Sequence, residues 1–385
     1  MLYVSLPITG LHILLLLMQS IHIKSKDPNS NREYIIEPLN LIHYIGKGAF
    51  GHVVKCKCLT YQMEYAAKII DYKMTGFPKE IYEYECLNAS KIRAYSKTVS
   101  KSTNLVVAED ECETKEQYYI IYPLYKKKDL RFILSEMDQR LPESEVWELI
   151  RHIANGLYHL HSKLNLIHRD LKIENIFVSD NEDEKGEYYS KNIYYIGDFG
   201  LTRDRDDATT NCGSVETKAP EIQSGKYDTR SDIWSLGIIM YYVLYGIYPF
   251  HSFNFNALTV QLQSGTYRVY TQQKVSELAI CFLESCLQRD PSERILIGDI
   301  YKFLKLDELN KPFKVPYNLQ HTFSCVNSEV LELSIDKGKR KYHMGPIKLL
   351  ETSIYKAKQV QYSMIPMYLS VFSNDDEKED WINAE

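Results

Sequence analysis

The sequence lacks the features that identify several common classes of protein. Its eight cysteines form no C-x-x-C pairs of the kind that bind zinc, so free or buried thiols in a reducing compartment are favoured. Its formal net charge of −5 provides no basic field, and we therefore expect no nucleic-acid partner. With 44% hydrophobic and 25% charged residues, the composition excludes a disordered chain. A length of 385 residues suits one two-lobed domain with appendages.

A long uninterrupted apolar run is also missing. Residues 1–23 are apolar, but Pro7, Gly10 and His12 interrupt them, and no Lys or Arg precedes the central run. Three interpretations stay open: a membrane anchor, a signal sequence, and a start codon placed too early. Contact with a membrane through residues 1–23 is therefore left open, and the rest of the chain is expected in the cytoplasm. Residues 24–35 are polar and are interpreted as a linker.

The most informative stretch reads His168-Arg169-Asp170-Leu171-Lys172-Ile173-Glu174-Asn175, and Asp198-Phe199-Gly200 follows it. Asp170 is suited to accept the proton of an incoming hydroxyl, while Asn175 and Asp198 offer the hard oxygen ligands that Mg²⁺ prefers. Lys172 adds a positive charge beside a transferring phosphoryl group. The tripeptide H-R-D alone carries no information, but the eight-residue pattern with D-F-G at this distance is typical of phosphoryl transfer.

On these motifs the chain resembles the eukaryotic protein kinases over residues 36–310. The resemblance implies an α+β, bilobal fold with a β-rich N-lobe (about 36–122) carrying helix αC, a hinge (123–125) and a mainly helical C-lobe (126–310). It implies ATP and Mg²⁺ as cofactors. Lys172 and Ser214 follow the serine/threonine pattern, so serine and threonine hydroxyls of protein substrates are the expected acceptors. No role is predicted for residues 311–385, and no oligomeric state.

A glycine-rich turn between two predicted strands is the expected cover of the ATP phosphates. Its pattern is G-x-G-x-x-G-x-V. Glycines are suited to this position because they have no Cβ to keep the backbone N–H groups away from the phosphates. A Rossmann site would need a helix directly after the glycines, whereas another strand follows here. The residues assigned to this cover are Ile45, Gly46, Lys47, Gly48, Ala49, Phe50, Gly51 and Val53.

The resemblance also implies the remaining contacts to ATP. Lys68, in the predicted strand Glu64–Ile70, is expected to hold the α- and β-phosphates. Its partner is expected on the following helix, where Glu80 and Glu83 share one face; Glu83 is preferred, with Leu87 one turn later in the regulatory spine. Adenine is expected to contact four residues, which are Ala66, the carbonyl of Pro123, the N–H of Tyr125, and Phe177 as the floor.

The segment from Asp198 to Glu221 is interpreted as an activation loop. A phosphate on Thr209 or Thr210 is expected to pair with Arg169, and Ser214 to bridge Asp170 and Lys172. By the same resemblance, Asp232 anchors the backbone of the catalytic loop, Glu221 pairs with Arg294, and Glu174 recognises a basic residue before the acceptor. Two alternatives remain, an ATP-binding pseudokinase that acts as a scaffold and a kinase of small molecules.

Overall fold

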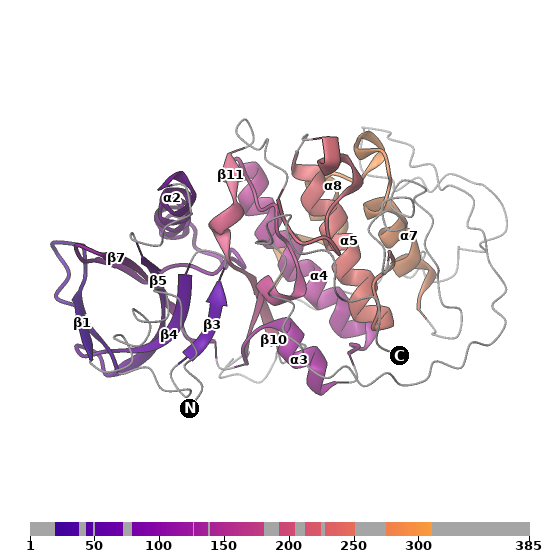
Figure 1. Ribbon diagram of the computed structural model, residues 1–385. Helices are drawn as coiled ribbons and strands as arrows, with labels where there is room; N and C mark the ends of the chain where they lie inside the picture. The colour runs from indigo at the N-terminus through magenta and orange to yellow at the C-terminus, as the bar shows by residue number, and fades with distance from the viewer. Residues whose placement is uncertain are drawn as a thin grey trace, which may run out of the picture. The chain divides into compact units, whose positions relative to one another are not determined.

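The computed structural model describes residues 20–309 except for 38–43, 49–50, 72–78, 126, 138, 181–191, 205–211, 225–227 and 251–274. Nearly all of the apolar segment 1–23 and all of 311–385 lie outside the described residues. Figure 1 shows a β-rich N-terminal lobe followed along the chain by a helical C-terminal lobe, so the predicted bilobal α+β fold is confirmed. Within the described ranges, no helix combines the length and the apolar character needed to cross a membrane.

The N-terminal lobe is built on one antiparallel sheet. Its path runs β1-β2-β4-β5-β7-β6, and β3 pairs with β4 beside it. Side chains alternate across the sheet, as the twofold period of a strand requires, so that Val54, Cys56 and Cys58 of β4 face the core. The strands are β1 (Ile21–Lys24), β2 (Glu33–Ile36), β3 (Tyr44–Gly48), β4 (Gly51–Cys58), β5 (Met63–Asp71), β6 (Asp110–Glu113) and β7 (Gln117–Pro123).

The first two strands correct the sequence interpretation. Residues 24–35 were predicted as a linker, but they contain the end of β1, a turn and most of β2. The two strands form an antiparallel hairpin, and β2 also pairs with β4. Tyr34 and Ile36 are buried in the sheet's core. The polar stretch of the linker forms the turn, where the backbone N–H of Asn29 donates to the Asp27 carboxylate at 2.9 Å. The prediction was wrong because each strand has only four residues, too few to show a clear alternation.

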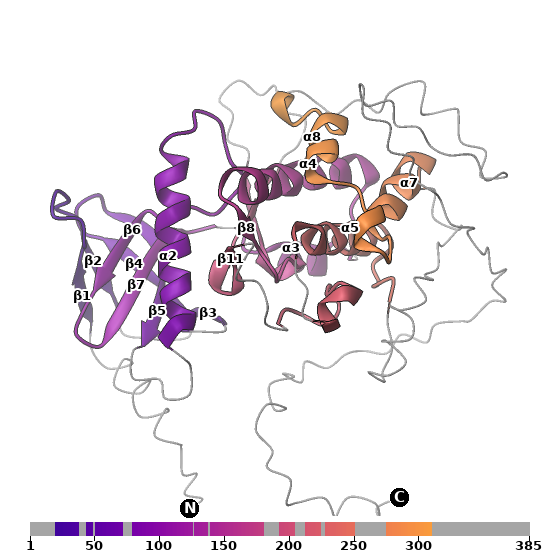
Figure 2. The ribbon, with the colours of Figure 1, turned by 90° about the horizontal axis from the view of Figure 1, so that it is seen from above.

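Helix α2 (Lys79–Ser96) lies along the sheet, as Figure 2 shows from above. Ala89 packs with Ile70, Tyr118 and Ile120 of the sheet. One turn later, Ile92 belongs to the hydrophobic core of the helical lobe. Helix α2 therefore contributes to the cores of both lobes.

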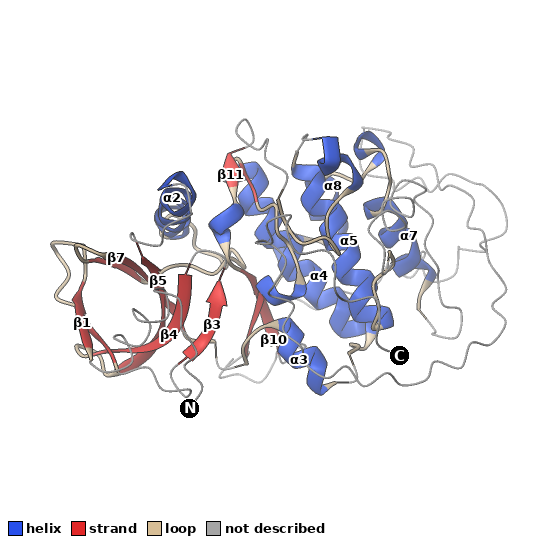
Figure 3. Ribbon diagram, viewed as in Figure 1, coloured by secondary structure: helices blue, strands red, loops and turns tan. Residues whose placement is uncertain are grey.

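The C-terminal lobe surrounds one buried helix (Figure 3). Helix α5 (Thr229–Tyr245) is apolar on most sides, as expected of a helix inside a lobe, and it ends at Gly246 with φ of 74°. Around it lie α3 (Leu130–Glu136), α4 (Glu143–Tyr158), α7 (Glu277–Cys286) and α8 (Ile297–Phe303). Four short strands carry the segments that form the site: β8 (Leu166–Ile167), β9 (Ile176–Asp180), β10 (Asn192–Ile196) and β11 (Arg203–Asp204).

A buried ion pair fastens the end of the predicted activation loop to this lobe. Arg294 is 1% exposed, and its two terminal nitrogens donate to the two carboxylate oxygens of Glu221 at 2.6 and 2.7 Å. Its Nε donates to the carbonyl of Gln288 at 2.7 Å. Only a planar guanidinium satisfies all three acceptors at once, and the pairing matches the sequence prediction.

We expect Arg294→Ala to lower the free energy of unfolding by about 3–5 kcal/mol, because the Glu221 carboxylate is left without its buried partner. Urea unfolding followed by circular dichroism measures this change. The matched control is Arg230→Ala, which removes a more exposed pair with Asp228 at 3.5 Å and should cost less than about 1 kcal/mol. Equal losses in the two variants would contradict the expectation.

Candidate active site

The catalytic loop is held by one buried carboxylate. Asp232, near the start of α5, accepts the backbone N–H groups of His168 at 2.8 Å and Arg169 at 3.0 Å. His161 Nε2 lies 2.8 Å from the same carboxylate. Burial by itself raises the pKa of Asp232, but the hydrogen bond from His161 and nearby histidines lower it below its ordinary value. Asp232 therefore stays charged and fixes the loop, whose Arg169 adopts φ of 71°.

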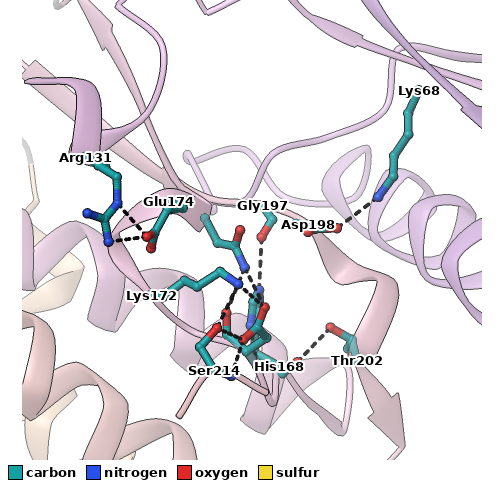
Figure 4. A network of polar contacts seen from close by, with 11 residues as sticks. Lys68, Arg131, His168, Lys172, Glu174, Gly197, Asp198, Thr202 and Ser214 are labelled. Atoms are coloured by element: carbon teal, nitrogen blue, oxygen red, sulfur yellow. Dashed lines mark hydrogen bonds and ion pairs between the residues drawn. The ribbon is translucent and has the colours of Figure 1, made fainter. Parts of the chain in front are cut away.

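Lys172 and Ser214 lie side by side (Figure 4), and both contact the predicted base, Asp170. Lys172 Nζ lies 2.7 Å from Asp170 Oδ2, and Ser214 donates to Asp170 Oδ1 from both its hydroxyl and its backbone N–H, each at 2.8 Å. Lys172 also donates to the Ser214 hydroxyl at 2.8 Å. The structure thus brings together the three residues that the sequence placed around the acceptor hydroxyl.

Asn175 and Asp198 fit the ligand set of a divalent cation. The Asn175 side-chain N–H donates to the backbone carbonyl of Asp170 at 2.8 Å, which orients the amide. Asp198 sits in a left-handed backbone conformation with φ of 60°. Burial is the largest single influence and raises its pKa, but the charge and hydrogen bond of Lys68, together with His168 and Lys172, bring the pKa below its ordinary value, so the carboxylate is charged. One carboxylate and one amide, completed by phosphate oxygens and water, suit Mg²⁺.

Lys68 lies between two carboxylates. It projects from β5, where its register partners are Val53 and Ile120, and it is 5% exposed. Its Nζ lies 2.9 Å from Asp198 Oδ1 and forms an ion pair with Glu85 of α2. Burial disfavours the charged lysine, but the two carboxylates raise its pKa above the ordinary value. The lysine is thus charged and held in place.

The partner of Lys68 is therefore Glu85, and the prediction of Glu83 was wrong. Glu83 is exposed, whereas Glu85 is 1% exposed. Leu87, predicted in the regulatory spine, is 57% exposed. The face of α2 that meets the site is displaced by two residues, about 200° around the helix, from the face that carries Glu83.

Sequence reasoning also missed Asn88 on the same helix. Its amide is buried and donates to the carbonyls of Phe199 at 3.1 Å and Thr202 at 3.0 Å. This ties α2 to the Asp-Phe-Gly segment directly. The available signal was its position three residues after Glu85, which places both on one face of the helix.

The glycine-rich turn lies between β3 and β4. Gly46, Lys47 and Gly48 belong to β3 and Gly51 begins β4, whereas Ala49 and Phe50 lie outside the described residues. A Cβ on Gly51 would lie 2.0 Å from the carbonyl oxygen of Ile69, so only glycine fits there. Of the two apolar residues that flank the turn, Ile45 is 44% exposed and Val53 is half-buried.

The residues predicted around adenine lie at the junction of the lobes. Ala66 is paired with Tyr122 between β5 and β7, and Pro123 ends β7. Phe177 of β9 has its ring centroid 5.6 Å from that of Tyr125. A Cβ on Gly197 would lie 2.7 Å from the Phe177 ring, so the residue before Asp198 packs tightly against the predicted floor.

The predicted regulatory threonines, Thr209 and Thr210, lie outside the described residues. Their predicted partner Arg169 is 5% exposed. One of its terminal nitrogens lies 2.7 Å from the sulfur of Cys212, two residues after Thr210. Arg169 therefore contacts the C-terminal side of the segment that carries the two threonines.

Comparison with known proteins agrees with this geometry. A family model described as "Protein kinase domain" matches residues 39–303. The chain is 30% identical over 285 residues to the serine/threonine-protein kinase H1 homolog of Danio rerio, covering 72% of this chain and 62% of that protein. It is 28% identical over 276 residues to the probable cell cycle serine/threonine-protein kinase CDC5 homolog of Encephalitozoon cuniculi, covering 69% of this chain and 54% of that protein.

The human hormonally up-regulated neu tumor-associated kinase is 30% identical over 286 residues, covering 72% of this chain. That match covers 37% of the human protein. The chain thus spans less than two thirds of the length of each of these three relatives.

We expect Glu85→Gln to lower kcat/KM for ATP by about thirtyfold, because a hydrogen bond between charged groups is worth about 1.5–3 kcal/mol. Glutamine keeps the shape of the side chain and removes its charge. Glu83→Gln is the matched control on the same helix, and its kcat/KM for ATP should stay within about twofold of the wild-type value. Steady-state kinetics with varied ATP decide between the two glutamates, and a larger loss in Glu83→Gln would refute the assignment.

Proposed function

Because the chain belongs to the protein kinase family, we propose that it transfers the γ-phosphate of ATP to serine and threonine hydroxyls of proteins. The observation that carries this proposal is the arrangement of Lys172 and Ser214 around Asp170. It provides a base, a cation and an orienting hydroxyl at one point. The names of the relatives, two of which are serine/threonine-protein kinases, support the same acceptor class.

In the proposed reaction, the acceptor oxygen forms a bond to the γ-phosphorus while the bond from that phosphorus to the bridging oxygen breaks. ADP leaves with the electron pair of the broken bond, and the proton of the acceptor hydroxyl passes to Asp170. The carboxylate is directed by its contacts with Lys172, Ser214 and Asn175. Lys172 offsets the negative charge of the transferring group, because its ammonium lies beside the base.

Lys68 is proposed to bind the α- and β-phosphates, with Glu85 and Asp198 fixing its position. Asn175 and Asp198 are proposed to hold Mg²⁺. When bound, the cation would offset the charge of the phosphates and align them. Among the described residues no group of three or more His, Cys, Asp or Glu side chains could hold a metal.

A scaffold that only binds ATP is the competing function. Such a protein has no use for a base held by a lysine and a hydroxyl, and the contacts around Asp170 favour catalysis for this reason. A kinase of small molecules is disfavoured by the Glu221–Arg294 pair and by Asp232. These belong to the part of the fold that, by the family resemblance, accepts protein substrates.

We expect Asp170→Asn to lower kcat for transfer to a serine/threonine peptide library by about two orders of magnitude or more. The KM for ATP should change little, because Asp170 faces the acceptor. Asp180→Asn, at the end of β9, is the matched control and should keep full activity. Transfer of labelled γ-phosphate from Mg-ATP gives both constants. An active Asp170→Asn would remove the base from the proposal, and a wild type that binds ATP without transfer would favour the scaffold.

The contacts of Glu174 bear on which peptides are accepted. The sequence suggested that Glu174 recognises a basic residue before the acceptor. In the structure, Arg131 of α3 forms an ion pair with it, and Arg131 Nε donates to Glu174 Oε1 at 2.5 Å (Figure 4). The side chains are 50% and 34% exposed, so the pair lies at the surface, two residues from Lys172. We propose that Arg131 masks the acidic charge and suppresses a preference for basic peptides.

The expected result is that Arg131→Ala raises kcat/KM for peptides with arginine before the acceptor by about three- to fivefold, the effect of an exposed ion pair of up to about 1 kcal/mol. Peptides with alanine there should be unaffected. Lys127→Ala removes a half-buried cation that pairs with Asp180 and serves as the control. No gain for arginine peptides in Arg131→Ala would rule out masking.

A further inference from the structure

The hairpin β1–β2 closes the N-terminal sheet into a ring. At one side β2 pairs with β4, with Tyr34 opposite Cys58. At the other side the chain leaving β1 reaches β6, where Ser25 pairs with Cys112 and the backbone N–H of Lys26 donates to the carbonyl of Glu111 at 2.7 Å. The six-strand path therefore returns to its start (Figure 1), which leaves β6 paired on both sides.

Asp110, the first residue of β6, is held by this hairpin. It is 1% exposed. Ser25 Oγ donates to its Oδ1 at 2.8 Å, and the buried Tyr34 hydroxyl donates to its Oδ2 at 3.0 Å. Arg93 of α2 approaches Oδ1 to 3.9 Å. A buried carboxylate needs such partners, so the hairpin and α2 share one anionic group.

Glu111 provides a second connection between the same parts. Its backbone carbonyl accepts from Lys26 of the hairpin, and its carboxylate accepts from Ser90 Oγ of α2 at 2.6 Å. Lys26 also lies 4.9 Å above the ring of Tyr118, whose hydroxyl donates to Glu111. Two adjacent residues of β6 thus face the hairpin on one side and α2 on the other.

The hairpin is linked to α2 through β6 and does not fill the space between them directly. A polar cleft of about 520 Å³ lies between the turn of the hairpin and the C-terminal end of α2, and its lining includes Asn31, Arg32, Arg93, Lys97 and Glu109. Ser90 and Arg93 lie five and eight residues beyond Glu85 on one continuous helix, about 7.5 and 12 Å along its axis. Ser90 and Arg93 therefore share one continuous helix with Glu85 and Asn88.

We propose that the hairpin Ile21–Ile36 positions α2 through Asp110 and Glu111, and so sets the Glu85 carboxylate against Lys68. Ser25, Tyr34 and Asp110 are then positioning residues, which do not contact the site and act on it through α2. The proposal rests on the proposed kinase activity for its kinetic readout. The catalytic competence of this chain would thus depend on residues that lie before the region matched to the kinase family.

The test combines Ser25→Ala and Tyr34→Phe, which remove both hydroxyls from Asp110 and keep the buried ring. The pair of changes is made in the full chain, with and without Glu85→Gln, and kcat is measured well below the melting temperature. We expect kcat to fall about five- to twentyfold in the wild-type background and less than about twofold beside Glu85→Gln, because residues that act through one contact are not additive. Ser25→Thr, which keeps a hydroxyl, should restore kcat relative to Ser25→Ala.

Hydrogen exchange of the α2 amides supplies a readout that does not need activity, and exchange over residues 79–96 should accelerate in the double variant. Lys24→Ala, which breaks the exposed pair with Glu33 in the same hairpin, is the control and should change neither kcat nor exchange. A lower melting temperature with unchanged kcat and unchanged α2 exchange would overturn the proposal, as would equal losses of kcat in both backgrounds. If the double variant does not fold, Ser25→Ala is tested alone, because Ser25 is only half-buried, and the same changes in kcat and in α2 exchange are expected.

Discussion

The ammonium of Lys68 is the charge around which both lobes are arranged. A lysine that is 5% exposed is costly to bury unless opposite charges surround it, and here it meets one carboxylate from each lobe. Glu85 comes from α2 and Asp198 from the segment that follows β10. Satisfying this one cation therefore requires α2, β5 and the Asp-Phe-Gly segment to be in place together, so the proposed binding of ATP would be coupled to the relative placement of the lobes.

The same physical rule recurs at each loop that the site depends on. Asp232 holds the backbone of the catalytic loop, Glu221 is held by Arg294, and Asp110 joins the hairpin to β6 and α2. Each is a buried or largely buried carboxylate that is satisfied by directed donors from segments far apart along the chain. Such contacts favour one geometry, because any alternative packing that left the buried charge without its donors would lose more free energy than its other contacts could supply. They determine geometry more than they add net stability.

The acceptor side of the site follows a different rule, because its charges remain near the surface. The Arg131–Glu174 pair is partly exposed, so water screens it and its contribution is small. A weak, exposed pair can still alter which peptides are favoured, since the competing substrates differ by one charge. In the proposed function, the buried charges thus define the reaction, and the exposed charges adjust which peptides are selected.

The sequence by itself determined the family, the bilobal fold and the residues of the catalytic loop. These residues lie close together along the chain, so their spacing alone is enough to predict their chemistry. Tertiary structure decided which glutamate meets Lys68, because several acidic residues of α2 satisfy the local pattern and only packing against both lobes selects the buried face. It also decided that residues 21–24 and 33–36 are strands, since Tyr34 and Asp110 are separated by 76 residues and short strands acquire stability only from such distant partners.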